Sequence, residues 1–343
     1  MRIDSRRLIH AQAILDDVVA SGGQACALAA VANRDGVVWS HAVPGAERVS
    51  ADSIFLLASI TKPMLATGVM RLVEQGRLLL EKPVRAYLPE FGGGAKDGVS
   101  AWNLLTHTSG LDESEWMSVR MAGPDDGRTC FEFACRAPVS FEPGSRCSYC
   151  TLSFAVLAEL IARLSGRPYW EFLRDEVFGP LAMPDTAFEP IDPARAAPVR
   201  DMGPPGTIER FTVRKVAGGG MWSTLGDLAR FGRAFLRGGE LDGARVLSPA
   251  TVSWMTRNHT LDLTQIVEER PAPFDYGLGW GKMTRDRCAP FSPSAFAHGG
   301  ATGTLLHVDP EYDLVFVYLT NRWGAEQETP RRLLHAVYGA MGA

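Results

Sequence analysis

A serine and a lysine lie three residues apart in the otherwise apolar stretch "LLASITKPML", residues 56–65. If Ser59 opens the helix that the apolar spacing predicts up to about residue 74, Lys62 lies on the same face one turn later, with roughly 5 to 6 Å between their β-carbons. An apolar setting favours the neutral, basic form of a lysine, and such a neighbour can take the proton of a serine nucleophile. The same residues also fit a helix cap and a lysine that reaches the surface, so both interpretations stay open at this point.

Two further stretches supply groups that such a pair needs. Tyr149 stands after a Pro-Gly turn at the entrance to a predicted helix, where its phenol can face a cleft and share a proton with Lys62. Gly299 and Gly300, in "FAHGGATGTLL", are expected at the start of a strand, where the missing side chains let a ligand approach the backbone. These residues therefore join Ser59 and Lys62 as candidates for one site.

Both ends of the chain predict antiparallel strands that would carry these groups. Residues 25–45 hold two apolar runs on either side of "NRDG", whose Asp-Gly favours the positive backbone angles of a hairpin turn. Residues 302–321 repeat the pattern around a turn at Asp309-Pro310. Amphipathic helices are predicted before the first hairpin, over 1–23, and after the second, over 329–342.

The middle of the chain is mainly helical in pattern. Three segments have helical apolar spacing and end in glycine, over residues 61–76, 151–166 and 225–239. The economical packing is an α+β fold, in which an antiparallel sheet assembled from both chain ends is joined to an inserted lobe. We expect residues 1–79 and 213–343 to form the sheet domain and residues 80–212 the mainly helical lobe.

Composition narrows the class of function. The chain has 343 residues and is 46% hydrophobic, and its 35 Lys and Arg against 39 Asp and Glu give a net charge of −4 without a long run of one sign. An electrostatic case for nucleic acid or an anionic membrane is lacking, so a small-molecule ester or amide is the expected partner. Asp16 and Asp17 interrupt the apolar run that a signal peptide needs, which favours a cytoplasmic protein.

Cysteine spacing raises one alternative, a metal site. Four of the six cysteines form two closely spaced pairs, which make a four-thiolate zinc site conceivable: Cys130, Cys135, Cys147 and Cys150. The first pair lies in a helical-looking segment, "FEFACRA", and no helix-borne histidine pair supports a catalytic metal. We therefore expect no metal and no cofactor.

The serine, tyrosine and glycine stretches together resemble the serine β-lactamase and penicillin-binding protein superfamily, specifically its class C-like branch, which includes family VIII carboxylesterases and D-aminopeptidases. The resemblance runs from about residue 25 to residue 325. Beyond "SITK" it includes "LLTHTSGL" (104–111), "PLAMPDTAF" (180–188), "AGGGMWSTLGDLARFGRAF" (217–235), "YGLGWG" (276–281) and "HGGATGTLLHVDPEYDLVFVYLTNR" (298–322). It implies a β-lactamase/transpeptidase-like fold, an antiparallel sheet flanked by helices plus a helical lobe, with the site between them.

Roles for individual residues follow from this resemblance. It implies that Ser59 is the nucleophile, that Lys62 accepts its proton, and that Tyr149 relays a proton to the leaving group. The backbone N–H groups of Ser59 and Ala301 would form the oxyanion hole, which stabilises a tetrahedral intermediate. The implied chemistry is acyl transfer through an acyl-enzyme.

Two positions depart from the lactamase pattern. Thr151 stands where the tyrosine motif usually has Asn, which replaces an amide that donates and accepts with a shorter hydroxyl. His298, Gly299 and Gly300 stand where lactamases have Lys-Thr-Gly, which removes a fixed cation for a substrate carboxylate. We expect these residues to contact substrate and to disfavour β-lactams.

Other conspicuous residues have structural explanations. His107 in "LLTHTSGL" is interpreted as part of a turn, because Lys62 and Tyr149 already fill the role of a base. A Ser-His-Asp hydrolase is disfavoured, since the sequence has no Gly-x-Ser-x-Gly. One or two tryptophans are expected to line the cleft, among Trp116, Trp222, Trp280 and Trp323.

The leading hypothesis is a serine hydrolase that acts on small esters, with possible acyl transfer to alcohols or amines. Alternatives are a D-aminopeptidase or amidase, a weak β-lactamase, and a binding sensor without turnover. Residues 112–129 are predicted to form a loop near the cleft entrance that sets specificity. The sequence does not reveal the physiological substrate or the oligomeric state.

Overall fold

The computed structural model describes residues 2–122, 129–286 and 288–342. Its centre is an antiparallel sheet of six strands in the order β10, β11, β12, β13, β2, β3. Four of the strands come from the C-terminal part of the chain and two from the N-terminal part, so the predicted assembly of one sheet from both ends is confirmed. The bounds are β10 Gly281–Lys282, β11 Phe296–Gly299, β12 Leu305–Asp309, β13 Leu314–Leu319, β2 Ala27–Ala32 and β3 Val37–Val43.

The two predicted hairpins are neighbours in this sheet, where β13 of one pairs with β2 of the other. β2 and β3 pair across the "NRDG" turn, in which the side chain of Asn33 accepts the N–H groups of Asp35 and Gly36 at 2.9 and 3.0 Å. β12 and β13 pair around the second turn, which ends at Asp313 with a φ of 52°. Every residue of β2 and β13 is buried. Apolar contacts therefore cover both faces of the sheet centre.

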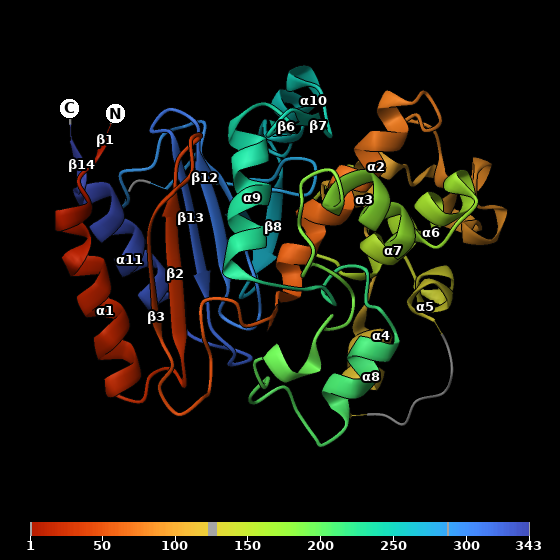
Figure 1. Ribbon diagram of the computed structural model, residues 1–343. Coiled ribbons are helices and arrows are strands. Elements are labelled where there is room, and N and C mark those ends of the chain that lie inside the picture. The colour runs from red at the N-terminus through yellow and green to blue at the C-terminus, as the bar shows by residue number, and fades with distance from the viewer. Residues whose placement is uncertain (1, 123–128, 287, 343) are drawn as a thin grey trace.

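Different helices cover the two faces (Figure 1). α1 (Ile9–Ala20) and α11 (Glu328–Gly339) pack on the face that carries Ala29, Val31 and Phe316. α9 (Leu225–Leu236) packs on the opposite face, where Gly232 lies so close to β13 that a β-carbon there would come within 2.5 Å of Val315 Cγ1. The chain ends meet beside α1, because β1 (Arg2–Ile3) pairs with β14 (Met341–Gly342).

The other helices gather on the side of the molecule away from α1 and α11 (Figure 1). α2 (Thr61–Glu74) packs against α6 (Leu152–Ser165), which ends at Gly166 in the left-handed conformation. The remaining helices are α3 Ala101–Leu105, α4 Ser114–Ala122, α5 Cys130–Arg136, α7 Tyr169–Leu173, α8 Thr207–Val213 and α10 Pro249–Met255. The boundaries of the helical lobe at residues 80 and 212 stay a prediction.

Short strand pairs and single helical turns complete the described chain. The pairs join β4 (Phe55–Leu56) to β5 (Trp222–Ser223), β6 (Glu240–Leu241) to β7 (Ala244–Arg245), and β8 (Thr264–Val267) to β9 (Arg270–Pro273). The helical turns are η1 Ser5–Leu8, η2 Ala58–Ile60, η3 Val84–Ala86, η4 Pro89–Phe91, η5 Gly94–Gly98, η6 Arg174–Phe178 and η7 Pro193–Arg195. In the described part of the chain, every helix is too short or too polar to cross a membrane.

Two local predictions were wrong. Residues 114–122 of the expected 112–129 loop form α4, and residues 123–128 lie outside the described residues. Gly299 and Gly300 lie at the end of β11 and not at the start of a strand, because β12 begins only at Leu305. The sequence analysis joined the glycines to the apolar run that follows them and took both as one strand. The turn between β11 and β12 contains no proline or charged residue that would have separated them.

Candidate active site

Ser59 lies in a tight turn that joins β4 to α2. It is in the middle of η2, and the preceding residue, Ala58, has a φ of +48°. A non-glycine residue rarely adopts this conformation, and such strain clusters at functional sites. Two hydrogen bonds join the turn to the backbone of Met221. The Leu57 N–H donates to the Met221 carbonyl at 2.8 Å, and the Met221 N–H donates to Thr61 Oγ1 at 3.1 Å. Ser59 itself is partly exposed.

Lys62 points from the first turn of α2 into the space beside Ser59. Its side chain is fully buried, with an exposed fraction of 0%. Lys62 Nζ lies 3.2 Å from Ser59 Oγ and 3.5 Å from Thr151 Oγ1, and it donates to the Gly218 carbonyl at 2.7 Å. The helical spacing predicted this pair, and the structure places the two groups within reach of proton transfer.

Gly218 is a residue that sequence reasoning did not single out. A β-carbon at this position would lie 2.7 Å from Thr151 Cγ2 and 3.2 Å from the Thr151 carbonyl oxygen. Glycine therefore lets the backbone of the 217–220 segment approach α6 closely enough for its carbonyl to bind Lys62. The run of three glycines at 218–220 was the available signal.

Tyr149 lies across Lys62 in the segment before α6. Its ring centroid is 4.6 Å from Lys62 Nζ, and 38% of the residue surface is exposed. Desolvation around the hydroxyl raises the pKa of Tyr149, and a hydrogen bond with Ser59 opposes that rise. The phenol therefore stays protonated at neutral pH while it contacts both the candidate nucleophile and the candidate base.

His107 contacts the Tyr149 ring and bonds to the residues on either side of Tyr149. Its backbone carbonyl accepts the Ser148 N–H at 2.8 Å, and its Nδ1 accepts the Cys150 N–H at 3.0 Å. The His107 and Tyr149 ring centroids are 4.3 Å apart. Burial lowers the pKa of His107 well below its usual value, and its φ is +59°. The structure thus places His107 in a turn that holds the tyrosine segment.

Glu113 was also missed from the sequence. One oxygen, Oε2, accepts the N–H groups of Thr151 and Leu152 at 2.5 and 3.1 Å. These are among the amides at the start of α6 that have no partner within the helix, so Glu113 caps α6 from another segment. Its charge also raises the pKa of Tyr149. An isolated acidic residue carries no periodic signal that would have identified this contact.

Hydrogen bonds join the segment after β11 to the turn that carries Ser59. Thr302 Oγ1 donates to the Leu56 carbonyl at 2.8 Å, and Thr304 Oγ1 donates to the Leu57 carbonyl at 3.0 Å. A β-carbon on Gly300 would come within 2.2 Å of the Leu57 oxygen. This glycine is therefore needed for the close approach of the two segments.

The backbone N–H groups of Ser59 and Ala301 are the predicted oxyanion hole. Among residues 2–122, 129–286 and 288–342, neither group donates to a side chain or to a backbone carbonyl outside its own helix or strand. Ala301 is held by its carbonyl, which accepts the Gly324 N–H at 2.7 Å. Such N–H groups can stabilise negative charge on a substrate oxygen.

His298 is buried at the edge of this region and has partners on both ring nitrogens. Nδ1 lies 2.8 Å from the Gly299 carbonyl, which can only accept, so Nδ1 carries the proton. Nε2 lies 2.8 Å from Tyr276 Oη and accepts its hydrogen when the ring is neutral. Burial, aided by the charge of Lys62, lowers the pKa of His298 to about 3. His298 is therefore neutral at physiological pH.

The structure gathers most of the predicted residues and separates others from them. Trp280 packs among Phe231, Phe235 and Phe296 in the core, with an exposed fraction of 0%. Trp116 and Trp222 are also buried. Among the described residues, no disulfide joins two cysteines, and no cluster of three or more His, Cys, Asp or Glu is arranged to hold a metal ion. Burial raises the pKa of the Cys147 thiol to about 11.

Comparison with known proteins identifies the family. The sequence matches the family described as Beta-lactamase over residues 11–339. The chain belongs to the Beta-lactamase family. Protein Rv1367c of Mycobacterium tuberculosis is 31% identical over 315 residues, which cover 78% of this chain and 77% of the relative. Esterase EstB of Burkholderia gladioli is 34% identical over 214 residues, which cover 56% of this chain and 54% of that esterase.

A solved structure supports the fold. EstCE1, described as a hydrolase with promiscuous acyltransferase activity, superposes with a TM-score of 0.82 at 22% identity and covers 98% of this chain and 99% of its own. The predicted β-lactamase/transpeptidase-like fold is confirmed. As a member of the Beta-lactamase family with esterases among its relatives, the chain is a serine hydrolase.

Proposed function

We propose that this Beta-lactamase family member is a carboxylesterase that cleaves small esters through an acyl-enzyme on Ser59. The carrying observation is the 3.2 Å separation between Ser59 Oγ and Nζ of the fully buried Lys62. A hydroxyl beside a buried amine at this distance meets the requirement of an activated nucleophile.

The first half of the reaction follows from the positions of the groups. Lys62 Nζ takes the proton of Ser59 Oγ as that oxygen bonds to the ester carbonyl carbon. The carbonyl oxygen becomes an oxyanion, which the N–H groups of Ser59 and Ala301 stabilise. Tyr149 gives its proton to the leaving alcohol oxygen and regains one from Lys62, and the alcohol departs as the acyl-enzyme forms.

Water completes the cycle. Tyr149 and Lys62 accept a proton from a water molecule that attacks the acyl carbon, and the oxyanion forms again in the same hole. When it collapses, Ser59 Oγ leaves with a proton and the carboxylic acid is released. An alcohol or amine in place of water would give acyl transfer.

Thr151 and His298 support esters over β-lactams. A β-lactam carboxylate gains from a fixed cation, whereas His298 is neutral because its pKa is about 3, and both of its ring nitrogens have partners. An acylamide side chain gains from an amide such as Asn, whereas Thr151 presents a hydroxyl 3.5 Å from Lys62 Nζ. Unmet polar groups of this kind cost about 1 to 3 kcal/mol each.

A series of p-nitrophenyl esters of increasing chain length, assayed alongside nitrocefin, tests this proposal. We expect rapid hydrolysis of short activated esters and slow or undetectable hydrolysis of nitrocefin. Thr151→Asn combined with His298→Lys should shift the ratio toward nitrocefin. A wild-type rate on nitrocefin comparable with that on p-nitrophenyl acetate would contradict the proposal.

One observation favours a second candidate, an amidase that acts on D-amino-acid amides. Glu113 Oε2 accepts the N–H groups of Thr151 and Leu152 at 2.5 and 3.1 Å, so its carboxylate lies next to the predicted substrate contact Thr151. A carboxylate beside the site would pair with the ammonium group of an amino-acid substrate. D-alaninamide and acetamide distinguish the two functions: an amidase of this kind would cleave the first and not the second, and a carboxylesterase would favour p-nitrophenyl acetate over both.

A further inference from the structure

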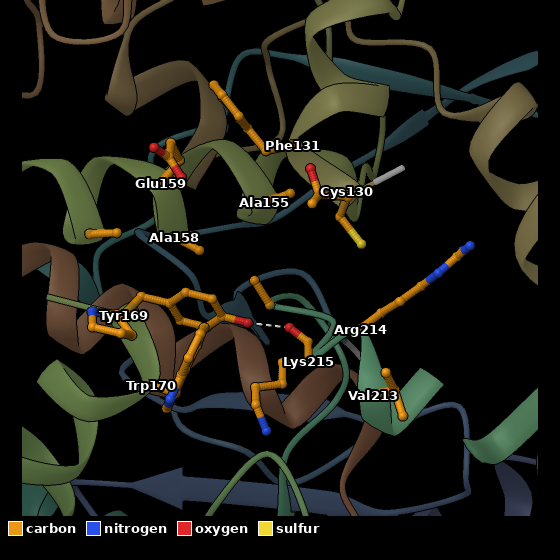
Figure 2. Close-up of a pocket in the computed structure, with 14 residues that line it drawn as sticks. Cys130, Phe131, Ala155, Ala158, Glu159, Tyr169, Trp170, Val213, Arg214 and Lys215 are labelled. Carbon is orange, nitrogen blue, oxygen red and sulfur yellow. Dashed lines mark hydrogen bonds between the residues drawn. The ribbon is translucent and has the colours of Figure 1, made fainter. Parts of the chain in front are cut away.

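A second cavity lies behind α6, away from the catalytic groups. It has a volume of about 690 Å³, and Figure 2 shows residues of α5, α6, α7 and the end of α8 around it. Its lining does not include Ser59, Lys62 or Tyr149. The close contact between Thr151 and Gly218 separates it from Lys62. A cavity of this size is within the range of small-molecule sites, about 300 to 1,000 Å³.

Two apolar walls face each other across this cavity. One wall consists of alanines three and four residues apart on α6, at Ala155, Ala158 and Ala162. The other contains the rings of Tyr169 and Trp170, whose centroids are 5.2 Å apart at an angle of 81°. Protein interiors normally fill such space with larger side chains. Small residues opposite two aromatic rings therefore leave room for an apolar guest.

Apolar groups are also exposed around the cavity. Val213 at the end of α8 has an exposed fraction of 77%, and Trp170 has one of 39%. Both residues line the cavity. An apolar ligand in the cavity would therefore also cover apolar surface at Val213 and Trp170.

Charge gives the cavity a preference. Lys215 Nζ lies 5.6 Å from the Trp170 ring centroid and 3.4 Å from Glu189 Oε1. The Glu189 side chain is 65% exposed, so this ion pair is weak and readily exchanged. Glu159, the acidic residue of the lining, lies 3.0 Å from Arg163. Lys215 and Trp170 also border a neighbouring pocket, which Glu189 lines, so an anion at this border can displace Glu189 from Lys215 without meeting an unpaired carboxylate in the cavity.

The position of Lys215 is fixed by the wall itself. Its carbonyl oxygen accepts a hydrogen bond from the hydroxyl of Tyr169, which Figure 2 shows as a dashed line. The backbone from which the Lys215 side chain extends is thus held at the aromatic wall, and its ammonium lies 5.6 Å from the centroid of the Trp170 ring.

We propose that this cavity binds an amphiphilic carboxylate. Its apolar body would lie between the α6 alanines and the rings of Tyr169 and Trp170, and its carboxylate would pair with Lys215. The site is separate from Ser59, so the proposal does not depend on which ester the enzyme cleaves.

Calorimetric titration of the whole protein with octanoate and with 1-octanol tests the head-group contact. We expect Lys215→Ala to weaken octanoate binding at least ten-fold and to leave 1-octanol binding unchanged. Lys82→Ala is the matched control, because Lys82 Nζ also lies over an aromatic ring, 4.9 Å from the Tyr87 centroid, but does not line this cavity. This control should bind both compounds as the wild type does.

Two further variants test the location. Val213→Glu adds a negative charge at a side chain that is 77% exposed, so it should fold normally and weaken octanoate more than 1-octanol. Ala158→Phe should fill the cavity and weaken both compounds at least ten-fold, with folding checked by circular dichroism. Octanoate binding that is the same in the wild type, Lys215→Ala and Val213→Glu would place the acid elsewhere and overturn the proposal.

Discussion

Two buried polar clusters, one around Lys62 and one around Asp309, differ in how their polar groups are satisfied. Lys62 Nζ lies 3.2 and 3.5 Å from two hydroxyls and donates to one carbonyl, and its neighbours Ser59 and Tyr149 are open to solvent. Asp309 is fully buried, with an exposed fraction of 0%, and its partner Tyr338 joins it to α11. Both clusters hold ionisable groups, but only the first places an amine beside a partly exposed hydroxyl.

The Asp309 cluster is closed. One carboxylate oxygen accepts from Ser292 Oγ at 2.5 Å and from the Glu311 N–H at 3.2 Å, and the other from the Ser292 N–H at 2.9 Å and Tyr338 Oη at 2.6 Å. His307 Nε2 lies 2.9 Å from the same Tyr338 oxygen. Because Tyr338 donates its hydrogen to Asp309, the histidine must donate to Tyr338. Burial alone therefore does not mark a reactive site, whereas a buried base beside an accessible hydroxyl does.

The largest expected effect is the loss of activity when the nucleophile is removed from the Lys62 cluster. Ser59→Ala should lower the rate of p-nitrophenyl acetate hydrolysis on the order of 10⁴-fold or more, because it removes the covalent nucleophile. The melting temperature should change little, since Ser59 is partly exposed. Ser118→Ala, which alters an exposed serine on α4, is the matched control and should retain full activity. A Ser59→Ala enzyme with more than a few per cent of wild-type kcat would show that another group is the nucleophile.

Tyr149→Phe should have the next largest effect. Loss of the phenol removes the proposed proton relay, which contributes typically 10² to 10⁴-fold, so we expect kcat to fall about 10³-fold. Tyr312→Phe removes a phenol that packs against Tyr338 in the other cluster and should leave kcat unchanged. Steady-state kinetics on p-nitrophenyl acetate measure both. Equal kcat values for Tyr149→Phe and the wild type would remove the tyrosine from the mechanism.

Asp309→Ala should lower stability and leave activity unchanged, which is the reverse of the effect expected for Ser59→Ala and Tyr149→Phe. The substitution leaves Ser292 and Tyr338 without their acceptor, and breaking such a buried cluster costs about 3 kcal/mol of unfolding free energy. Urea unfolding measures this cost, and kcat well below the unfolding transition should match the wild type. Asp262→Ala, at an exposed position, is the control. A loss of less than 1 kcal/mol would mean that the closed cluster contributes little to stability.

The smallest expected effect is a change in pH dependence. Burial lowers the pKa of His307 from its usual 6.5 to about 4. Between these values the unfolded chain binds a proton that the folded protein does not, so His307 makes the protein less stable as the pH falls from 6.5 to 4. His307→Gln should reduce this slope by up to about 1.4 kcal/mol per pH unit.

Urea unfolding at pH 4.5, 5.5 and 6.5 measures that slope. His10→Gln, at an exposed position on α1, is the control and should reproduce the wild-type slope. If His307→Gln also reproduces it, His307 gains its proton at the same pH in the folded and the unfolded protein, and burial does not hold it neutral.

Several predictions that depended on local patterns were confirmed. The Asp-Gly turn between two apolar runs placed β2 and β3, and the three- and four-residue spacing placed α11. The Ser59 and Lys62 pair followed from the geometry of one helical turn, although Ser59 lies in η2, just before α2. These elements depend on neighbours in sequence, which the sequence itself displays.

Contacts between distant segments could not be predicted in the same way. The Gly218 carbonyl accepts a hydrogen bond from Lys62, which lies 156 residues earlier in the chain. Every residue type has a backbone carbonyl, so the residue type at 218 does not indicate this contact. Glu113 caps α6 from a segment without periodicity. The hydrogen bond between His298 and Tyr276 could not be predicted either. His298 lies in β11, and the sequence analysis placed Gly299, the last residue of β11, at the start of a strand. Tyr149 was predicted to share a proton with Lys62 from its place at a helix entrance, and its role as a relay to the leaving group came from the resemblance to a known family.

The most direct test of the central claim is to label the protein with a fluorophosphonate and map the adduct by peptide mass spectrometry. The mechanism predicts one adduct per chain on Ser59, formed rapidly in the wild type and at least 10²-fold more slowly in Lys62→Ala, because the lysine takes the proton of the attacking hydroxyl. An adduct on any other serine, or equal labelling rates for the wild type and Lys62→Ala, would contradict the assignment of Ser59 and Lys62 as nucleophile and base.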